Sequence, residues 1–176
     1  LILTDNFKKV FPDRNIYSCY FDTVDYQMYQ DSIEGTVPRK KIRLRSYNKI
    51  LCDEVFFEIK INSVEGRFKT VKKINDYKNI MNKGFFDPNY GICYPKLIVR
   101  YKRSYLQKKN IRVTLDENIS FSRYNKSNKF IFSKYNNYDC AEIKCKTLDD
   151  LDEFDLNQVQ TIRNSKYCNG INEILK

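Results

Sequence analysis

The 176-residue sequence contains no histidine and no tryptophan, and it has only five glycines and four prolines. Without histidine, and without any Cys-x-x-Cys pair among its six cysteines, the chain lacks the ligands of a Cys/His zinc cluster. The scattered cysteines favour reduced, mostly buried thiols in a cytoplasmic domain, with an extracellular disulfide framework as the alternative. The scarcity of glycine and proline argues against a fold dominated by loops.

Long hydrophobic runs are also absent. No stretch approaches the roughly 20 apolar residues that a membrane span needs. The first eleven residues include Asp5, Lys8 and Lys9 and show no cleavage-site pattern, so they do not resemble a signal peptide. The length fits one domain covering residues 1–176, with no internal boundary.

The chain is rich in aromatic and basic residues. Its 14 tyrosines and 12 phenylalanines, together with runs of isoleucine and valine, favour strands over a helical bundle. The 32 lysines and arginines exceed the 22 acids and give a formal charge of +10. This excess favours an anionic partner such as nucleic acid, acidic lipid or a phosphorylated molecule, although an AT-rich genome would also enrich lysine.

Several segments alternate long charged residues with apolar ones, as strands do when their two faces differ. In residues 39–47, Lys41, Arg43 and Arg45 share one face. In residues 55–61, Glu58 and Lys60 do the same, and residues 67–69 follow as a hairpin partner across the Glu65-Gly66 turn. Further strands are predicted at residues 17–23, 97–105, 111–116, 130–132 and 140–145.

Helices are predicted at both ends and in the middle of the chain. Residues 2–11 show apolar positions at helical spacing with Pro12 as a stop, and residues 76–83 end before Gly84. Residues 147–162 have the pattern of a capped helix that begins with acidic residues. Residues 24–37 predict a loop or a short helical excursion, and residues 86–95 a loop.

The cationic faces allow two interpretations. One is an ordinary antiparallel sheet with a wet face. The other is a closed barrel whose charged side chains point inward, where two like charges 4 Å apart repel by roughly 4 kcal/mol at an effective dielectric of about 20. Such a lumen would be relieved only by a polyanion, whose phosphate oxygens suit the planar fork of arginine and the point charge of lysine.

Seven short motifs resemble the VTC domain of polyphosphate polymerases, in the same order along nearly the whole chain. They are Tyr20-Phe21-Asp22-Thr23, residues 39–47, Phe57-Glu58-Ile59-Lys60, Tyr101-Lys102-Arg103, residues 112–116, Glu142-Ile143-Lys144 and Ser165-Lys166-Tyr167. The resemblance implies the triphosphate tunnel (CYTH-like) fold: an α+β fold dominated by β, with an eight-stranded antiparallel tunnel barrel and flanking helices, including a C-terminal one. The family's first strand has no counterpart, so the chain is expected to be truncated at its N-terminus and the barrel to lack that strand.

The resemblance also implies an activity and a site. VTC domains transfer the terminal phosphate of ATP to a polyphosphate chain with a manganese or magnesium ion. The implied catalytic contacts to phosphate come from six basic residues: Arg43, Arg45, Lys60, Arg103, Arg112 and Lys166. Lys41, Lys69 and Lys144 are further substrate-binding candidates, and Lys72 or Lys73 could replace Lys69. Glu142 is implied as a metal ligand; Glu58 would bind the metal or hold neighbouring cations, and Asp116 would bind metal or pair with a tunnel arginine.

Other functions are compatible with the same residues. The same fold hosts tripolyphosphate and nucleoside triphosphate hydrolases, and a non-catalytic module for polyphosphate or inositol phosphates would use the same cations. The expected partners are ATP and polyphosphate, with a membrane partner for polymer export as a further option. Nucleic-acid binding is not expected, because the basic residues are spread over several strands and form no recognised motif.

Overall fold

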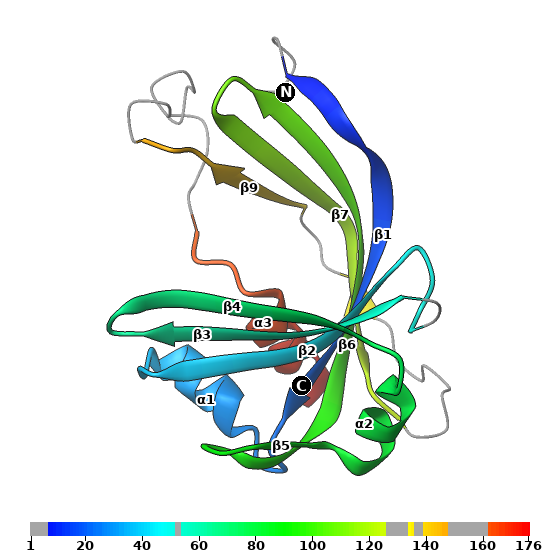
Figure 1. The fold of residues 1–176 in the computed structure, drawn as a ribbon, viewed down its shortest axis with the longest axis vertical. Helices are drawn as coiled ribbons and strands as arrows, with labels where there is room; N and C mark the ends of the chain where they lie inside the picture. The colour runs from blue at the N-terminus through cyan, green and yellow to red at the C-terminus, as the bar shows by residue number, and fades with distance from the viewer. Residues whose placement is uncertain (1–6, 52–53, 126–133, 136–138, 148–161) are drawn as a thin grey trace.

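A computed structural model describes residues 7–51, 54–125, 134–135, 139–147 and 162–176. Its main feature is an antiparallel sheet that curls into a half-barrel (Figure 1). The strands are β1 (Lys8–Asp22), β2 (Arg39–Tyr47), β3 (Val55–Ser63), β4 (Gly66–Ile74), β5 (Phe85–Asp87), β6 (Gly91–Lys108), β7 (Ile111–Arg123), β8 (Lys134–Tyr135) and β9 (Cys140–Lys144). The helices are α1 (Gln27–Glu34), α2 (Tyr77–Lys83) and α3 (Lys166–Leu175).

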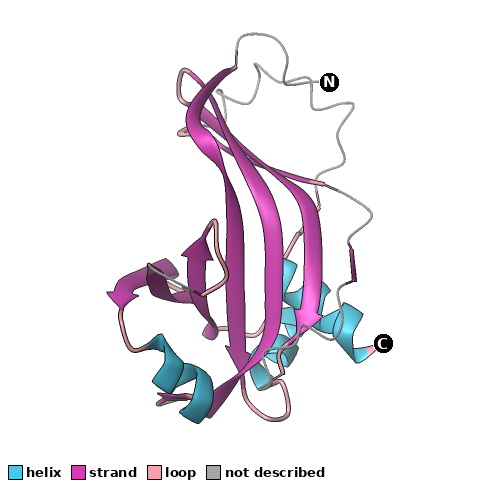
Figure 2. Cartoon of the chain, turned by 90° about the vertical axis from the view of Figure 1, so that its right-hand side faces the viewer, coloured by secondary structure: helices cyan, strands magenta, loops and turns pink. Residues whose placement is uncertain are grey.

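Three long strands connect the two ends of the curl. The sheet runs β4-β3-β2-β1-β6-β7, with β8 and β9 paired to β7. Strands β1, β6 and β7 are 15, 18 and 13 residues long and lie side by side (Figure 2). Strand β2 pairs with the last part of β1, whereas β9 pairs with the first part of β7. This mainly β, antiparallel architecture with flanking helices and a C-terminal helix confirms the predicted tunnel-type fold.

The hydrophobic core lies on both sides of the central strands. One cluster joins β1, β6 and β7 to α3 through Leu97, Phe121 and Ile171, each at most 1% exposed. A second cluster packs β2 and β6 against α1 and the β5 region through Ile42, Leu44 and Met28. Each such side chain stabilises the fold by roughly 1.5–3 kcal/mol on full burial. The first cluster includes Tyr20 and Tyr101, whose hydroxyls contact Arg43 and Arg45, so this cluster and the charged faces of the strands share the concave side.

Two proline-containing segments differ from the sequence prediction. The predicted helix at residues 2–11 is wrong from Lys8 onward, where β1 already pairs with β6. Register shifts on both sides of Phe11 break the two-residue alternation, and Pro12 lies within this irregular stretch. The predicted loop at residues 86–95 contains β5 and the start of β6, where Pro95 lies next to another shift.

The other predicted elements agree where the structure describes them. The β3–β4 hairpin turns at Val64 and Glu65, one residue before the predicted Glu65-Gly66, and Asp76 caps α2 by accepting from the Asn79 N–H. The strand predicted at residues 130–132 lies outside the described part of the chain. Of the helix predicted at residues 147–162, only the first and last residues are described. Five cysteines in the described part are free thiols. None of the helices in the described ranges combines the length and hydrophobicity needed to cross a bilayer.

Candidate functional site

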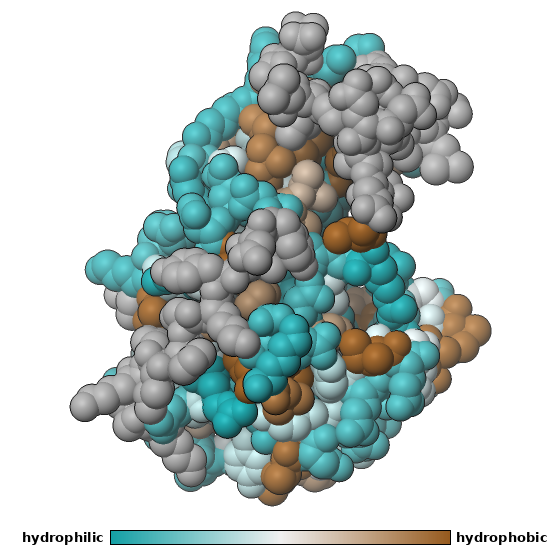
Figure 3. Space-filling model, turned by 180° about the vertical axis from the view of Figure 1, so that it is seen from behind, coloured by the Kyte–Doolittle hydropathy of each residue, from teal (hydrophilic) through white to brown (hydrophobic). Residues whose placement is uncertain are grey.

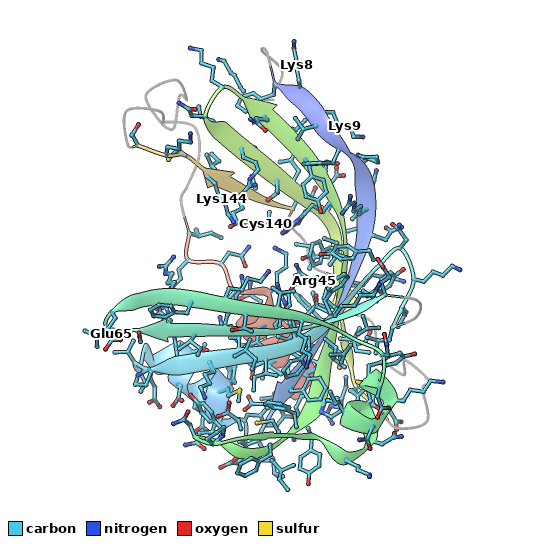
Figure 4. The ribbon with its side chains drawn as sticks, viewed as in Figure 1. Lys8, Lys9, Arg45, Glu65, Cys140 and Lys144 are labelled. Atoms are coloured by element: carbon cyan, nitrogen blue, oxygen red, sulfur yellow. The ribbon has the colours of Figure 1, made fainter. Side chains whose placement is uncertain are left out.

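Two adjoining cavities occupy the concave side of the sheet. The inner cavity, about 330 Å³, lies between β1, β2, β6 and the start of α3. The outer cavity, about 690 Å³, lies between the ends of β2–β4, the end of α1 and the segment before α3. Both are lined by Lys41, Lys60, Lys69, Glu142, Asn164 and Ser165, so they form one cationic space. Figure 4 shows Arg45 near the centre of the curl, with Lys144 coming from β9 and Glu65 at the far tip of the hairpin.

A buried glutamate organises the first group of cations. Glu58 is 2% exposed, and its Oε2 accepts from Arg43 Nη2 at 2.5 Å and Nε at 2.8 Å. Its Oε1 lies 3.4 Å from Lys69 Nζ and 3.9 Å from Arg45 Nη1. Burial alone would raise the pKa of Glu58, but the charges of Arg43 and Arg45 outweigh it and hold the pKa below 4.5. Glu58 is therefore an ionised counter-charge for cations from β2 and β4.

A buried aspartate does the same on the opposite wall. Asp116 on β7 is 0% exposed and forms a bidentate pair with Arg103, with Nε–Oδ1 at 2.5 Å and Nη2–Oδ2 at 2.7 Å. Lys166, the first residue of α3, lies 2.6 Å from the same carboxylate. Burial raises the pKa of Asp116, yet Arg103 and Lys166 outweigh that effect and lower it below 3.8. Of its two predicted roles, Asp116 takes that of partner to the cations.

Tyrosines hold the guanidinium groups from the side, a role that the sequence reasoning missed. Arg43 Nη1 donates to Tyr20 Oη at 2.9 Å, and Arg45 Nη2 donates to Tyr101 Oη at 3.2 Å. Tyr101 shares a strand face with Arg103, so its parity was readable from the sequence. The position of Tyr20 opposite Arg43 depends on the β1–β2 register, which the sequence alone did not reveal.

Helix α3 brings its first turn to the cavity because its N-terminus is tied to the walls. Ser165 caps the helix by accepting from the Cys168 N–H, and its Oγ also lies 2.8 Å from Lys41 Nζ. Tyr167 stacks on Tyr20 with ring centroids 5.1 Å apart, and its hydroxyl donates to the buried Asp22. These contacts place Lys166 over the cavity.

Eight of the nine predicted basic residues line the cationic space: Lys41, Arg43, Arg45, Lys60, Lys69, Arg103, Lys144 and Lys166. Arg112 is not among the lining residues and is exposed. It shares a face of β7 with Asp116, but four residues of strand separate the two by about 13 Å. The sequence identified the face correctly and could not show how far along the strand the cavity extends.

The described residues offer one carboxylate to a divalent metal at the cavity. Glu142 lines both cavities and is about half exposed, with Lys144 Nζ 3.3 Å from its Oε1. The second predicted ligand, Glu58, is buried and engaged by Arg43 and Lys69. Within the described residues there is no cluster of three or more His, Cys, Asp or Glu side chains that could hold a metal. Magnesium is commonly bound by one or two carboxylates together with substrate phosphates. Glu142 therefore fits a metal that phosphate oxygens help to hold.

Positive charge is concentrated in this space. Guanidinium and ammonium groups from β2, β3, β4, β6, β9 and α3 converge on one space, and the buried acids hold several of them in place before any ligand arrives. Preorganised donors of this kind stabilise phosphate charge without reorganisation cost. This curled antiparallel sheet with a basic interior defines a protein of the triphosphate tunnel class.

Comparison with known proteins identifies the family within this class. The family model described as "VTC domain" matches residues 4–175, so the chain belongs to the VTC-domain family. A Bacillus halodurans protein, whose crystal structure is described as that of a presumed adenylate cyclase, has a similar fold, with a TM-score of 0.55 and 14% identity. The match covers 86% of this chain and 80% of that one. No curated protein matches the chain.

Proposed function

We propose that this domain is a polyphosphate polymerase that transfers the terminal phosphate of ATP to a polyphosphate chain bound in the basic space. Its catalytic contacts would come from Arg43, Arg45, Lys60, Arg103 and Lys166, with Lys41, Lys69 and Lys144 binding the substrate further out. Arg112 would contribute only to a chain that extends beyond the cavity. A manganese or magnesium ion held by Glu142 and phosphate oxygens would neutralise charge on the transferred group.

One observation carries the proposal: basic side chains from opposite walls converge at the inner cavity. Arg43 and Arg45 come from β2, whereas Arg103 and Lys166 come from β6 and α3. Phosphoryl transfer depends mainly on positioning and on charge stabilisation, which this arrangement supplies. The acceptor is a phosphate oxygen that is already ionised at neutral pH, so the absence of histidine is no obstacle.

The first test is incubation of the purified domain with ATP and manganese, followed by electrophoresis of the products. We expect a ladder of long polyphosphate. Arg45→Gln should reduce its formation by at least about 100-fold, corresponding to roughly 2.7 kcal/mol of lost transition-state stabilisation. Arg100→Gln is the matched control, because Arg100 is exposed on β6 and lines neither cavity.

The same assay separates the alternatives. Release of orthophosphate without polymer would indicate a triphosphate hydrolase of the same fold. Tight binding of tripolyphosphate with no metal-dependent turnover would indicate a binding module. In either case the polymerase proposal would be wrong, although the basic space would remain the binding site.

A further inference from the structure

A further cavity, about 340 Å³ in volume, lies where β6 starts and β7 ends. Its lining includes three half-buried tyrosines and two cations: Tyr26, Tyr94, Tyr124, Lys96 and Arg123. We call it the tyrosine pocket. Its volume lies within the range of small-molecule sites, roughly 300–1,000 Å³. It shares no described lining residue with the inner or the outer cavity, so it is separate from the basic space.

The two cations of the tyrosine pocket are held by neutral groups. Lys96 Nζ donates to the carbonyl of Val24 at 3.2 Å and lies 4.6 Å from the centre of the Tyr26 ring. Arg123 Nη2 donates to the carbonyl of Ile174, in α3, at 2.8 Å. Carbonyls and aromatic rings orient a cation without neutralising it. Both side chains are therefore positioned by contacts that leave their charge in the pocket.

These two charges also act on each other. Burial lowers the pKa of Lys96, the charges of Asp22 and Asp25 oppose this effect, and the charge of Arg123 reinforces it. None of the described residues that line the pocket is acidic. An anion that reached both cations would relieve their repulsion and gain charge-assisted contacts.

The aromatic side of the pocket is set by an uncommon backbone conformation. Tyr26 has a φ of 62°, in the left-handed region that residues other than glycine rarely adopt. Its N–H donates to the Thr23 carbonyl at 3.3 Å, and its carbonyl accepts from the Gln30 N–H at 3.0 Å. Strained residues of this kind are concentrated at ligand sites. Here the conformation occurs at the residue whose ring lies beside the Lys96 ammonium group.

We infer that the tyrosine pocket is a second ligand site, outside the basic space, for a small anion built on a planar aromatic ring. Tyrosine rings favour stacked or edge-to-face contacts with another ring, and Lys96 and Arg123 supply the partners for one carboxylate or phosphate group. An aromatic carboxylate and a nucleoside monophosphate share this chemistry. The inference does not depend on the proposed function, because it concerns a different cavity.

The test is a ligand-observed NMR titration with two matched pairs of probes, in which one member of each pair lacks the aromatic ring. The pairs are benzoate with cyclohexanecarboxylate, and AMP with ribose 5-phosphate. Saturating tripolyphosphate is present throughout to occupy the basic space. We expect the aromatic member of at least one pair to bind roughly tenfold more tightly than its partner. Preference for benzoate alone identifies a carboxylate ligand, and preference for AMP alone a nucleotide.

Two variants assign the binding to this pocket. Lys96→Gln and Arg123→Gln should each weaken binding of the preferred probe by roughly tenfold, the effect of one lost charge-assisted contact. Lys78→Gln is the matched control and should have no effect, because Lys78 is exposed on α2 and lines none of the three cavities.

Three results would overturn the inference: no binding of either aromatic probe at millimolar concentration, equal binding within both pairs, or binding that neither pocket variant weakens. Lys96 and Arg123 lie on different strands, so loss of folding in one variant leaves the other to decide. The assay scores no turnover, and its outcome is therefore independent of whether the domain makes polyphosphate.

Discussion

Each buried carboxylate of the site is shared between cations from different elements. Glu58 on β3 joins Arg43 of β2 to Lys69 of β4. Asp116 on β7 joins Arg103 of β6 to Lys166 of α3. A single acid thus neutralises part of the local charge and fixes the direction of two long side chains. At this scale the acids position the cations.

Replacing Asp116 by asparagine should destabilise the protein in the absence of ligand. The change leaves Arg103 and Lys166, both largely buried, without their counter-charge, and breaking a buried pair costs about 3 kcal/mol or more. Thermal denaturation with and without tripolyphosphate measures the effect. Added tripolyphosphate should narrow the difference from wild type, because its oxygens can pair with the released cations.

The pH dependence of this difference follows from the lowered pKa of Asp116. Its carboxylate contributes stability above the unfolded pKa of 3.8, and this contribution is lost as the pH falls through the lower folded pKa. The gap between wild type and Asp116→Asn should therefore close only below about pH 4. Asp76→Asn, at the exposed N-cap of α2, serves as the control and should have a much smaller effect, because asparagine can also accept from the Asn79 N–H. A gap that persists unchanged into strong acid would show that ionisation of Asp116 does not stabilise the fold.

Helix α3 is the element whose position most directly controls the site. Gly170 faces the sheet so closely that an added Cβ would lie 2.6 Å from Leu97 Cδ2 and 2.7 Å from Phe121 Cδ1. The glycine therefore allows α3 to pack against β6 and β7. The same helix begins at Lys166 and is anchored through Tyr167 to Asp22, so its packing and its functional residue cannot move independently.

Gly170→Ala should impair both stability and phosphate binding. Alanine favours helix by about 1 kcal/mol, but overpacking against two core side chains costs about 1–3 kcal/mol and displaces α3 outward. We expect a lower melting temperature together with weaker tripolyphosphate binding. Glu173→Ala, at a partly exposed position of the same helix, is the comparison. A melting temperature above that of wild type would mean that the neighbouring side chains yield and helix propensity prevails.

Regular strands were predictable from the sequence, whereas interrupted strands and the register between them were not. Residues 39–47 show an unbroken alternation and match β2 at both ends. Around Phe11 and Pro95, bulges shift the alternation and imitate a helix or a loop. The basic residues that face the cavity from one strand were found because they are two residues apart and so share one face of that strand. Three arginines that line the outer cavity, Arg39, Arg67 and Arg163, were missed as site residues. They come from separate segments of the chain, and only the folded structure brings them together.

The whole molecule combines an overall excess of positive charge with a hollow where that charge is concentrated. Its formal charge is +10. On the side opposite to that of Figure 1, hydrophilic residues cover much of the coloured surface and hydrophobic residues form separate patches (Figure 3). The basic side chains on the concave side repel one another, so burial of the hydrophobic core must outweigh this repulsion. Repulsion among these cations offsets part of the stability that hydrophobic burial provides.

Salt should therefore stabilise the free protein and destabilise its complex. Raising sodium chloride from about 0.1 M to about 1 M shortens the screening length from roughly 10 Å to 3 Å. This weakens the repulsion among the lysines and arginines that line the two cavities. The melting temperature of the free protein should rise over this range. In the presence of tripolyphosphate the trend should reverse, because salt then screens the attraction between ligand and cations.

Lys41, Lys60 and Lys69 lie side by side on β2, β3 and β4 and form a lysine row. Lys60→Gln tests whether this row causes the salt dependence. Burial and the nearby arginine charge lower the pKa of Lys60, so its charged form opposes folding below its folded pKa, and this cost is relieved as the pH rises toward the unfolded value of 10.5. The variant should melt at a higher temperature than wild type at neutral pH, with a shallower dependence on salt, yet bind tripolyphosphate more weakly. Arg100→Gln lowers the net charge equally without touching the row. If both variants reduce the salt dependence of the melting temperature to the same extent, net charge alone governs it and the lysine row makes no separate contribution.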